Sequence, residues 1–411
     1  MLVITRNSRK QAMDRRMPLP ETTIRPAPDW HHSIRVAAFH FLVSRCIVFG
    51  IWIVAASLHA PPPTATGTFS DSTIVIGRDA TVSSLEKLAT FNDGGWYADI
   101  ASHGYEQRSF DVARQANWAF FPLQPLLWRA ATTVVVDAAA AGFLIANICF
   151  FVGLVVLHRL VRELRYEDDV ADRTLMFLAF CPTSYFFSLP WTESLFLMLT
   201  ASTFLAAVKE RWGMVFVFGA LACACRFSGL FLVPSLALWL WPRRNEIGWR
   251  PWAAIAAMPA GLAAFMLVLW RACGNPFAFA DIQQTWGRHL TIPYRAFGVV
   301  LMRPYFLASD WNLRPLNFVA FVSGVLAVCW LIRRRADYGL ATFLGLGLLA
   351  PAMTGSLTSL ARYTFGLFPV AIAAAVGLGS QKRERAFLAV SASLLALLAL
   401  AFQEAFAFAG A

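Results

Sequence analysis

Charged residues are scarce in this chain. Only 14% of its 411 residues are Asp, Glu, Lys or Arg, whereas 58% are hydrophobic. A soluble domain carries about 25% charged residues, so this composition excludes an ordinary water-soluble protein. Apolar runs long enough to cross about 30 Å of hydrocarbon as helices lie at 35–57, 138–157, 252–270, 315–332, 337–353 and 386–409. The sequence therefore predicts an all-α polytopic membrane protein.

Several familiar signatures are also missing. The chain has no P-loop, no dinucleotide-binding glycine fingerprint, no Gly-x-Ser-x-Gly and no His-Glu-x-x-His. It also lacks the Asp-x-Asp pair that holds the metal of a nucleotide sugar, and its 7 cysteines show neither metal-ligand spacing nor a paired framework. We predict no resident cofactor, with a divalent ion (Mg²⁺ or Mn²⁺) left as an open alternative.

The net charge of +11 is spread over short loops. Basic residues cluster at Arg6 to Arg16, Arg159 to Arg173, Lys209 and Arg211, Arg243 to Arg250, Arg333 to Arg335, and Lys382 to Arg385. This is the positive-inside pattern of membrane proteins, so the expected partners are membrane lipids and not nucleic acid. The first apolar run lacks a small-residue cleavage site and is predicted to be a retained helix.

Placing the basic loops in the cytoplasm orders the rest of the chain. A basic tail at 1–34 precedes one membrane domain at 35–409, with ten or eleven spans and external loops at 58–136 and 271–314. The segment 213–241 starts and finishes inside, so we predict a broken or half-depth hairpin at 226–229. The unusual polar segments then all fall on the non-cytoplasmic side, which predicts one site there; they are 91–127, 182–194, 273–289 and 354–363.

The most unusual acid is Asp93, which precedes two glycines in NDGGWY. A carboxylate near a bilayer is energetically unfavourable and is usually kept for function, and a general base suits such a position. The alternative is that Asp93 caps a short helix at 94–103. Asp99 and His103 share one helical face, so a structural hydrogen bond and a substrate contact both stay open for them.

Aromatic and polar side chains surround these acids. Trp96, Tyr97 and Tyr105 are predicted either as interfacial belt residues or as a sugar-binding platform. The segment 276–290 adds polar and aromatic groups beside a membrane helix, namely Gln283, Gln284, Trp286, Arg288 and His289. An arginine with neighbouring amides suits a phosphate or a hydroxyl-rich ligand; the end of a helix with snorkelling side chains is the alternative.

Two further arginines stand apart from the basic loops. Arg226 lies inside an apolar segment and needs a buried partner, for which Glu193 is the best candidate. A purely structural pair is one alternative, and Glu193 is also a candidate substrate-binding residue. Arg362, followed by Tyr363, is predicted at the start of an external helix. An arginine there runs against the positive-inside bias, which favours anion binding.

A set of motifs resembles a known family. They are FNDGGWYADIASHGY at 91–105, FFPL at 120–123, P…FF.S…TESLF at 182–196, RFSG at 226–229, F…Q..WGR at 279–288, W.L..LNF at 311–318 and S..RY…FP at 359–369. In this order they resemble the GPI second-mannose transferase family and its bacterial relatives, which are C-type (GT-C) glycosyltransferases. The resemblance covers roughly 35–378. One departure is Asn92, where the family usually has Trp, followed by GGW.

The resemblance implies a GT-C fold and an inverting glycosyltransferase. Its donor would be a polyprenyl-phosphate-linked hexose, most typically mannose, and its acceptor a hydroxyl of a lipid or glycan. Asp93 would be the catalytic base, and Arg288 and Arg362 would stabilise the leaving phosphate. The active site would face the periplasm of a bacterial inner membrane, or the endoplasmic reticulum lumen in a eukaryote. A lipid or solute transporter is the main alternative, and a non-catalytic scaffold leaves the convergence of polar segments unexplained.

Overall fold

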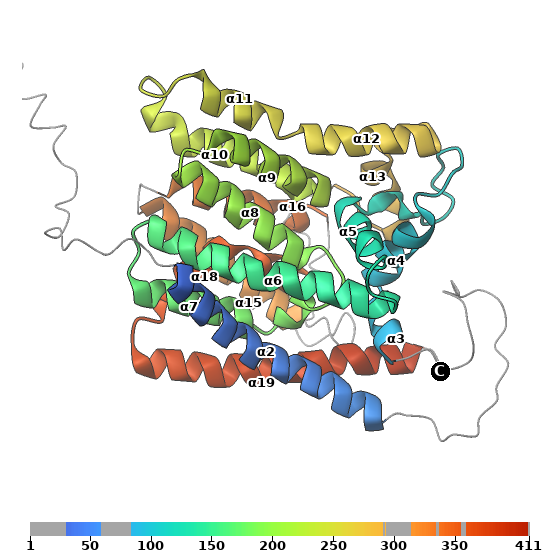
Figure 1. The fold of residues 1–411 in the computed structure, drawn as a ribbon, viewed down its shortest axis with the longest axis horizontal. Helices are drawn as coiled ribbons and strands as arrows, with labels where there is room; N and C mark the ends of the chain where they lie inside the picture. Colours follow the sequence, from blue (N-terminus) through green and yellow to red (C-terminus); the bar gives the residue numbers. More distant parts are fainter. Residues whose placement is uncertain are drawn as a thin grey trace, which may run out of the picture.

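The computed structural model describes residues 30–58, 84–290, 292, 314–333, 337–354 and 359–409, and these contain helices but no strand. The all-α prediction is therefore confirmed for the described part of the chain. Long helices lie side by side along one direction, and the short helices α3 (Ser84–Thr90), α4 (Asp93–His103) and α5 (Leu123–Ala131) gather at one end of them (Figure 1). The Pro/Thr-rich linker and most of the basic tail lie outside the described residues.

Within the described residues, five helical stretches are long and apolar enough to cross a membrane. They correspond to α2 (Trp30–Leu58), α6 (Ala138–Glu163), α11 (Trp249–Ala257) with α12 (Ala260–Cys273), α15 (Arg314–Arg333) and α19 (Gln381–Ala409). A sixth is added if α17 (Leu360–Gly366) and α18 (Phe368–Gly377), which meet at 74°, form one span. Apolar side chains such as Phe39, Ile53 and Leu326 are exposed on these helices, as expected for surfaces that face lipid.

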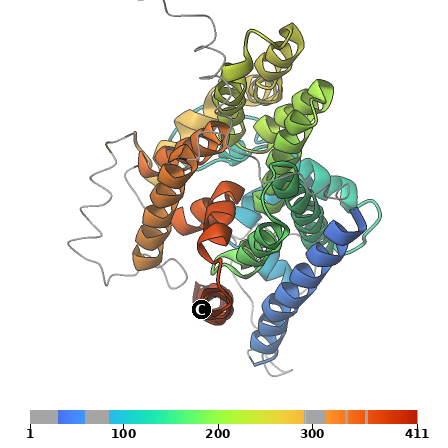
Figure 2. The same cartoon turned by 90° about the vertical axis from the view of Figure 1, so that its left-hand side faces the viewer.

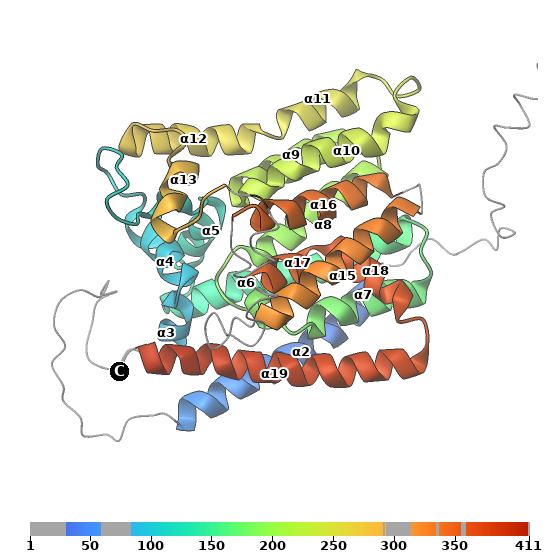
Figure 3. The same ribbon diagram turned by 180° about the vertical axis from the view of Figure 1, so that it is seen from behind.

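The remaining helices are shorter and fill the middle of the molecule. They are α7 (Asp168–Phe180), α8 (Glu193–Val208), α9 (Trp212–Cys225), α10 (Leu232–Leu240), α13 (Ala278–Asp281) and α16 (Tyr338–Ala352), with 3-10 turns at Asn117–Ala119, Ser184–Phe187, Phe227–Phe231, Trp241–Arg243 and Ile282–Trp286. The view from behind shows α15, α16 and α18 on the face opposite to α2 (Figure 3), and Figure 2 looks along the long helices. The total of ten or eleven spans stays a prediction.

The segment 213–241 forms the expected broken hairpin. Helix α9 ends at Cys225, Arg226 is extended, and a 3-10 turn leads into α10. Gly229 packs so closely on α9 that a Cβ there would lie 2.4 Å from the carbonyl oxygen of Ala222. The two ends of the hairpin meet, because Nη2 of Arg243 lies 3.2 Å from Oε1 of Glu210.

The basic loops share the other end of the molecule. Lys209 after α8 pairs with Glu163 at the end of α6, with 2.5 Å between Nζ and Oε1. The hydroxyl of Tyr166 donates to Asp337, just before α16, at 2.7 Å. These loops lie away from α3, α4 and α5 (Figure 1). Helix α2 begins at Trp30, so residues 30–34 of the predicted tail are already helical.

Candidate functional site

Two glycines let α4 begin directly against α3. A Cβ on Gly94 would lie 2.0 Å from the carbonyl oxygen of Ala89 and 3.0 Å from Nε1 of Trp191. A Cβ on Gly95 would lie 2.7 Å from the carbonyl oxygen of Thr90. The preceding Asn92 has φ of +51°, a region that Asn adopts several-fold more readily than most residues. The NDGG sequence is therefore what this tight entry to α4 requires.

Asp93 is the first residue of α4 and does not cap it. The N-cap position belongs to Asn92, which makes no side-chain cap bond, so the capping alternative for Asp93 is wrong. Its Oδ2 instead accepts a hydrogen bond from Nη1 of Arg362 at 2.9 Å. The Asp93 side chain is 32% exposed, and its Oδ1 accepts no hydrogen bond from any residue that the structure describes. The carboxylate is thus fixed through one oxygen and open at the other.

Behind Asp93 lies an ion cluster formed by Asp93, Glu193, Arg226 and Arg362. Oε1 of Glu193 accepts hydrogen bonds from Nε of Arg362 at 2.6 Å and from Nη1 of Arg226 at 2.9 Å. The predicted Glu193–Arg226 pair is therefore confirmed. The cluster holds two acids and two arginines, so its formal charge is zero. It joins α4, α8, the break after α9, and α17.

Arg362 lies in the first turn of α17, so the predicted helix start is confirmed, and its side chain is buried. Its side chain is only 5% exposed. The guanidinium carbon lies 4.3 Å from the ring centre of Trp191, 5.1 Å from that of Phe186 and 5.2 Å from that of Tyr363. Aromatic faces stabilise a cation at such distances. Of its three nitrogens, Nη2 alone makes no hydrogen bond within the described part of the chain.

Aromatic rings beside this cluster connect the two loops that are predicted to be external. Trp96 stacks on Phe120 with 5.7 Å between ring centres, and it meets Trp286 edge-on at 5.8 Å. Burial, and then the nearby Asp93 charge, raise the pKa of Tyr97 well above its usual range, so its phenol stays protonated. The hydroxyl of Tyr105 donates to the carbonyl of Phe120 at 2.7 Å, which gives Tyr105 a structural role.

Asp99 also has a structural role. Its Oδ1 lies 3.1 Å from Nδ1 of His103, and its Oδ2 accepts from Nδ2 of Asn117 at 2.8 Å. The same amide nitrogen donates to the carbonyl of Gly104 at 3.0 Å, and Oδ1 of Asn117 accepts from the amide of Glu106 at 3.0 Å. Of the two alternatives for Asp99, the structural one is observed. Asn117 itself was not predicted, although a buried amide in an apolar FFP segment is a usable signal.

The second of the loops predicted to be external reaches the site through Trp286. Nη1 of Arg288 donates to Oε1 of Gln283 at 3.0 Å, and Nε2 of Gln284 donates to the carbonyl of Asp281 at 3.0 Å. Arg288 and Gln284 are exposed. No contact within the described ranges joins Arg288 to Arg362. Their shared role at a leaving phosphate stays a prediction. The contacts do bring together parts of all four polar segments, at Asp93, Glu193, Trp286 and Arg362.

A scan against protein-family models finds no match to this chain, and a search of curated proteins finds none either. The family resemblance therefore rests on the motifs alone. What the residues establish is a buried, charge-balanced cluster with one accessible carboxylate, next to aromatic rings from two loops.

Proposed function

We propose that this protein transfers a hexose, with mannose as the first candidate, from a polyprenyl-phosphate donor to an acceptor hydroxyl. Asp93 is the general base of this reaction. The observation that carries the proposal is its carboxylate, which Arg362 holds through Oδ2 at 2.9 Å while the side chain stays 32% exposed. A general base needs a fixed orientation and a free lone pair within reach of its proton. Asp93 combines the two.

The proposed transfer forms one bond and breaks one bond at the anomeric carbon of the donor. Oδ1 of Asp93 takes the proton of the acceptor hydroxyl, and the acceptor oxygen forms a bond to the anomeric carbon. The bond from that carbon to the phosphate oxygen, on the opposite face of the sugar, breaks at the same time. Polyprenyl phosphate leaves with the electron pair, and the configuration at the anomeric carbon is inverted. Trp96 and Trp286 offer ring faces for the apolar side of the sugar.

The ion cluster supports the departure of the phosphate. It is formally neutral while Asp93 is ionised, and it becomes positive by one charge when Asp93 takes up the proton. Arg362 then has one counter-charge fewer, and its Nη2 is left to donate to the phosphate. Positive charge that develops with the transition state stabilises it more than charge already neutralised in the ground state. Arg362 thereby positions the base, and its positive charge becomes less neutralised when Asp93 takes up the proton.

The decisive experiment uses purified protein and a panel of polyprenyl-phosphate hexoses. Each donor is incubated with wild type and with Asp93→Asn in the presence of lipid and glycan acceptors. We expect release of polyprenyl phosphate from one donor, with an acceptor-dependent rate that falls sharply in the variant. No release from any donor and acceptor pair would contradict the proposal.

A transporter is the second candidate, favoured by one observation. Arg226 lies at the break after α9, and Arg362 lies in the pair α17–α18 that bends by 74°. Transporters commonly bind charged substrates at broken helices. Reconstituted liposomes separate the two functions: a transporter moves the lipid-linked sugar between leaflets without releasing polyprenyl phosphate.

A further inference from the structure

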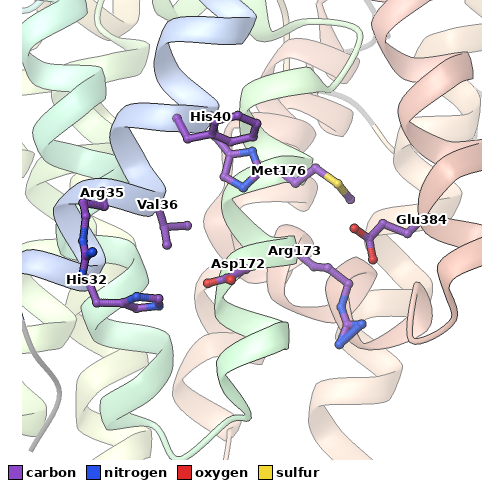
Figure 4. A pocket seen from close by; sticks show the side chains of 9 residues that line it. His32, Arg35, Val36, His40, Asp172, Arg173, Met176 and Glu384 are labelled. Atoms are coloured by element: carbon purple, nitrogen blue, oxygen red, sulfur yellow. The ribbon is translucent and has the colours of Figure 1, made fainter.

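Three potential metal ligands meet at the end of the molecule that carries the basic loops. They are His32 on α2, His158 on α6 and Asp172 on α7, and their ligand atoms all lie within 4.8 Å of one another. Figure 4 shows His32 and Asp172 close together, on neighbouring helices that border one cavity. This group shares no residue with the ion cluster around Asp93.

We propose that His32, His158 and Asp172 bind a divalent transition-metal ion, with Zn²⁺ as the best match. Two imidazoles and one carboxylate form a ligand set typical of zinc sites that keep an open position. Nitrogen ligands favour Zn²⁺, Co²⁺ or Ni²⁺ over Mg²⁺ and Ca²⁺. This ion therefore differs from the Mg²⁺ or Mn²⁺ considered for the glycosyl-transfer site.

The distances suit a tetrahedral ion after a small adjustment. Bonds of about 2.0–2.2 Å place ligand atoms roughly 3.3–3.5 Å apart. Nε2 of His158 lies 2.9 Å from Oδ1 of Asp172, so these two atoms need to separate by only a few tenths of an ångström. His32 is half-buried and makes no hydrogen bond to a described residue. Its ligand atom lies within 4.8 Å of the other two, so it has to approach them by up to about 1.5 Å to complete a tetrahedral site.

His158 is already oriented for this role. It is fully buried, and its Nδ1 lies 2.9 Å from the hydroxyl of Ser33. Metal-ligating histidines generally use their second ring nitrogen for such a bond, which fixes the ring and the tautomer. The Ser33 contact leaves Nε2 directed at Asp172, and the ring of His32 lies 5.5 Å away, centre to centre.

The cavity beside the ligands supplies the open position. It measures about 460 Å³ and is lined by His32 and Asp172 and also by His40, Glu384 and the guanidinium-bearing Arg35 and Arg173. Nδ1 of His40 is buried without a hydrogen-bond partner among the described residues. The two arginines oppose a bare cation, so we expect hydroxide or another small anion as the fourth ligand.

The test uses full-length, untagged protein with Zn²⁺ and, as a spectroscopic probe, Co²⁺. Wild type should bind one ion per chain in equilibrium dialysis, with the visible absorption of tetrahedral Co²⁺ and a raised melting temperature. His32→Ala and Asp172→Asn should each weaken binding by at least about tenfold, since even outer-shell changes have effects of this size. His103→Ala is the matched control, because that exposed histidine also lies beside an aspartate.

The variants are chosen so that misfolding does not obscure the result. His32 and Asp172 are partly exposed, whereas loss of the fully buried His158 could unfold the protein. Unchanged affinity in both His32→Ala and Asp172→Asn would overturn the site. So would equal loss in His103→Ala, or absence of any bound ion in folded wild type.

Discussion

Two buried arginines contact the segment 181–192, and they are held in different ways. Arg362 is bonded to the carboxylates of Asp93 and Glu193. Arg45 on α2 is 4% exposed and has neutral partners in the described structure. Its guanidinium donates to the carbonyl and hydroxyl of Ser184, the hydroxyl of Ser188, the hydroxyl of Ser44 and the carbonyl of Ala179.

The difference separates a fully bonded charge from one that we propose to take part in the reaction. Arg45 has five N–H donors, and each has an acceptor, so this group fixes the turn and offers nothing to a ligand. Arg362 leaves one nitrogen unbonded and connects to a carboxylate that solvent can reach. Burial of a charge is therefore a weak indicator of function in this protein, and the partners of that charge decide its role.

The largest effect is expected at the open carboxylate. Asp93→Asn is nearly isosteric and its amide oxygen can still accept from Arg362, so the fold should persist. Turnover should fall by roughly 10²–10⁴-fold, the usual contribution of a general base, with donor binding retained. Rates of polyprenyl-phosphate release and donor affinity measure the two parts. Asp99→Asn, which alters a structural carboxylate, is the control. Normal turnover in Asp93→Asn would show that Asp93 is not the base and would make Glu193 the next candidate.

The next effect concerns the arginine that holds this base. Arg362→Lys keeps the charge but loses the planar fork that reaches two carboxylates, so its turnover should fall nearly as far as that of Arg362→Ala. Breaking a buried pair on one side also removes about 3–5 kcal/mol of stability, measurable as a lower melting temperature. Arg226→Lys is the comparison, since Arg226 contacts Glu193 and not Asp93. Equal turnover in Arg362→Lys, Arg362→Ala and Arg226→Lys would show that Arg362 has no specific role in the reaction.

Arg45 provides the opposite case. Arg45→Met leaves buried hydroxyl and carbonyl groups without donors, at about 1–3 kcal/mol for each unsatisfied group. We expect a lower melting temperature with unchanged turnover per folded molecule. The active fraction is counted by size-exclusion chromatography before the assay. If Arg45→Met folds normally but loses turnover, Arg45 has a role in the reaction. The proposed difference between a structural Arg45 and a functional Arg362 would then be wrong.

The smallest perturbation tests which side of the membrane each end of the molecule faces. Single cysteines at Ser109, in the first external loop, and at Asn245, in a basic loop, are both exposed positions. In a cysteine-depleted background, an impermeant thiol reagent should label Ser109→Cys in intact cells and reach Asn245→Cys only after lysis. The reverse pattern would invert the orientation. Ser70, a second position suited to this test, lies outside the described residues.

The sequence alone determined the helical architecture, the break at Arg226, the Glu193–Arg226 pair and the meeting of the polar segments. Hydropathy marks apolar helices locally, and a buried arginine demands an acid from the few within reach. Once the basic loops are assigned to one end, the remaining polar loops have to share the other. Hydropathy, the need of a buried arginine for an acid and the placement of basic loops can all be derived from the sequence. None of them depends on how the helices pack.

The tertiary structure decided which polar groups touch. Asp93 and Arg362 are 269 positions apart, and Arg45 and Ser184 are 139 apart; neither contact was predicted. The same holds for His32, His158 and Asp172, which come from three helices. Helix periodicity gives the face that a side chain occupies but not the rotation and depth at which two helices meet. Those two quantities set every contact in the ion cluster, and they make Arg362 a buried partner of the Asp93 carboxylate.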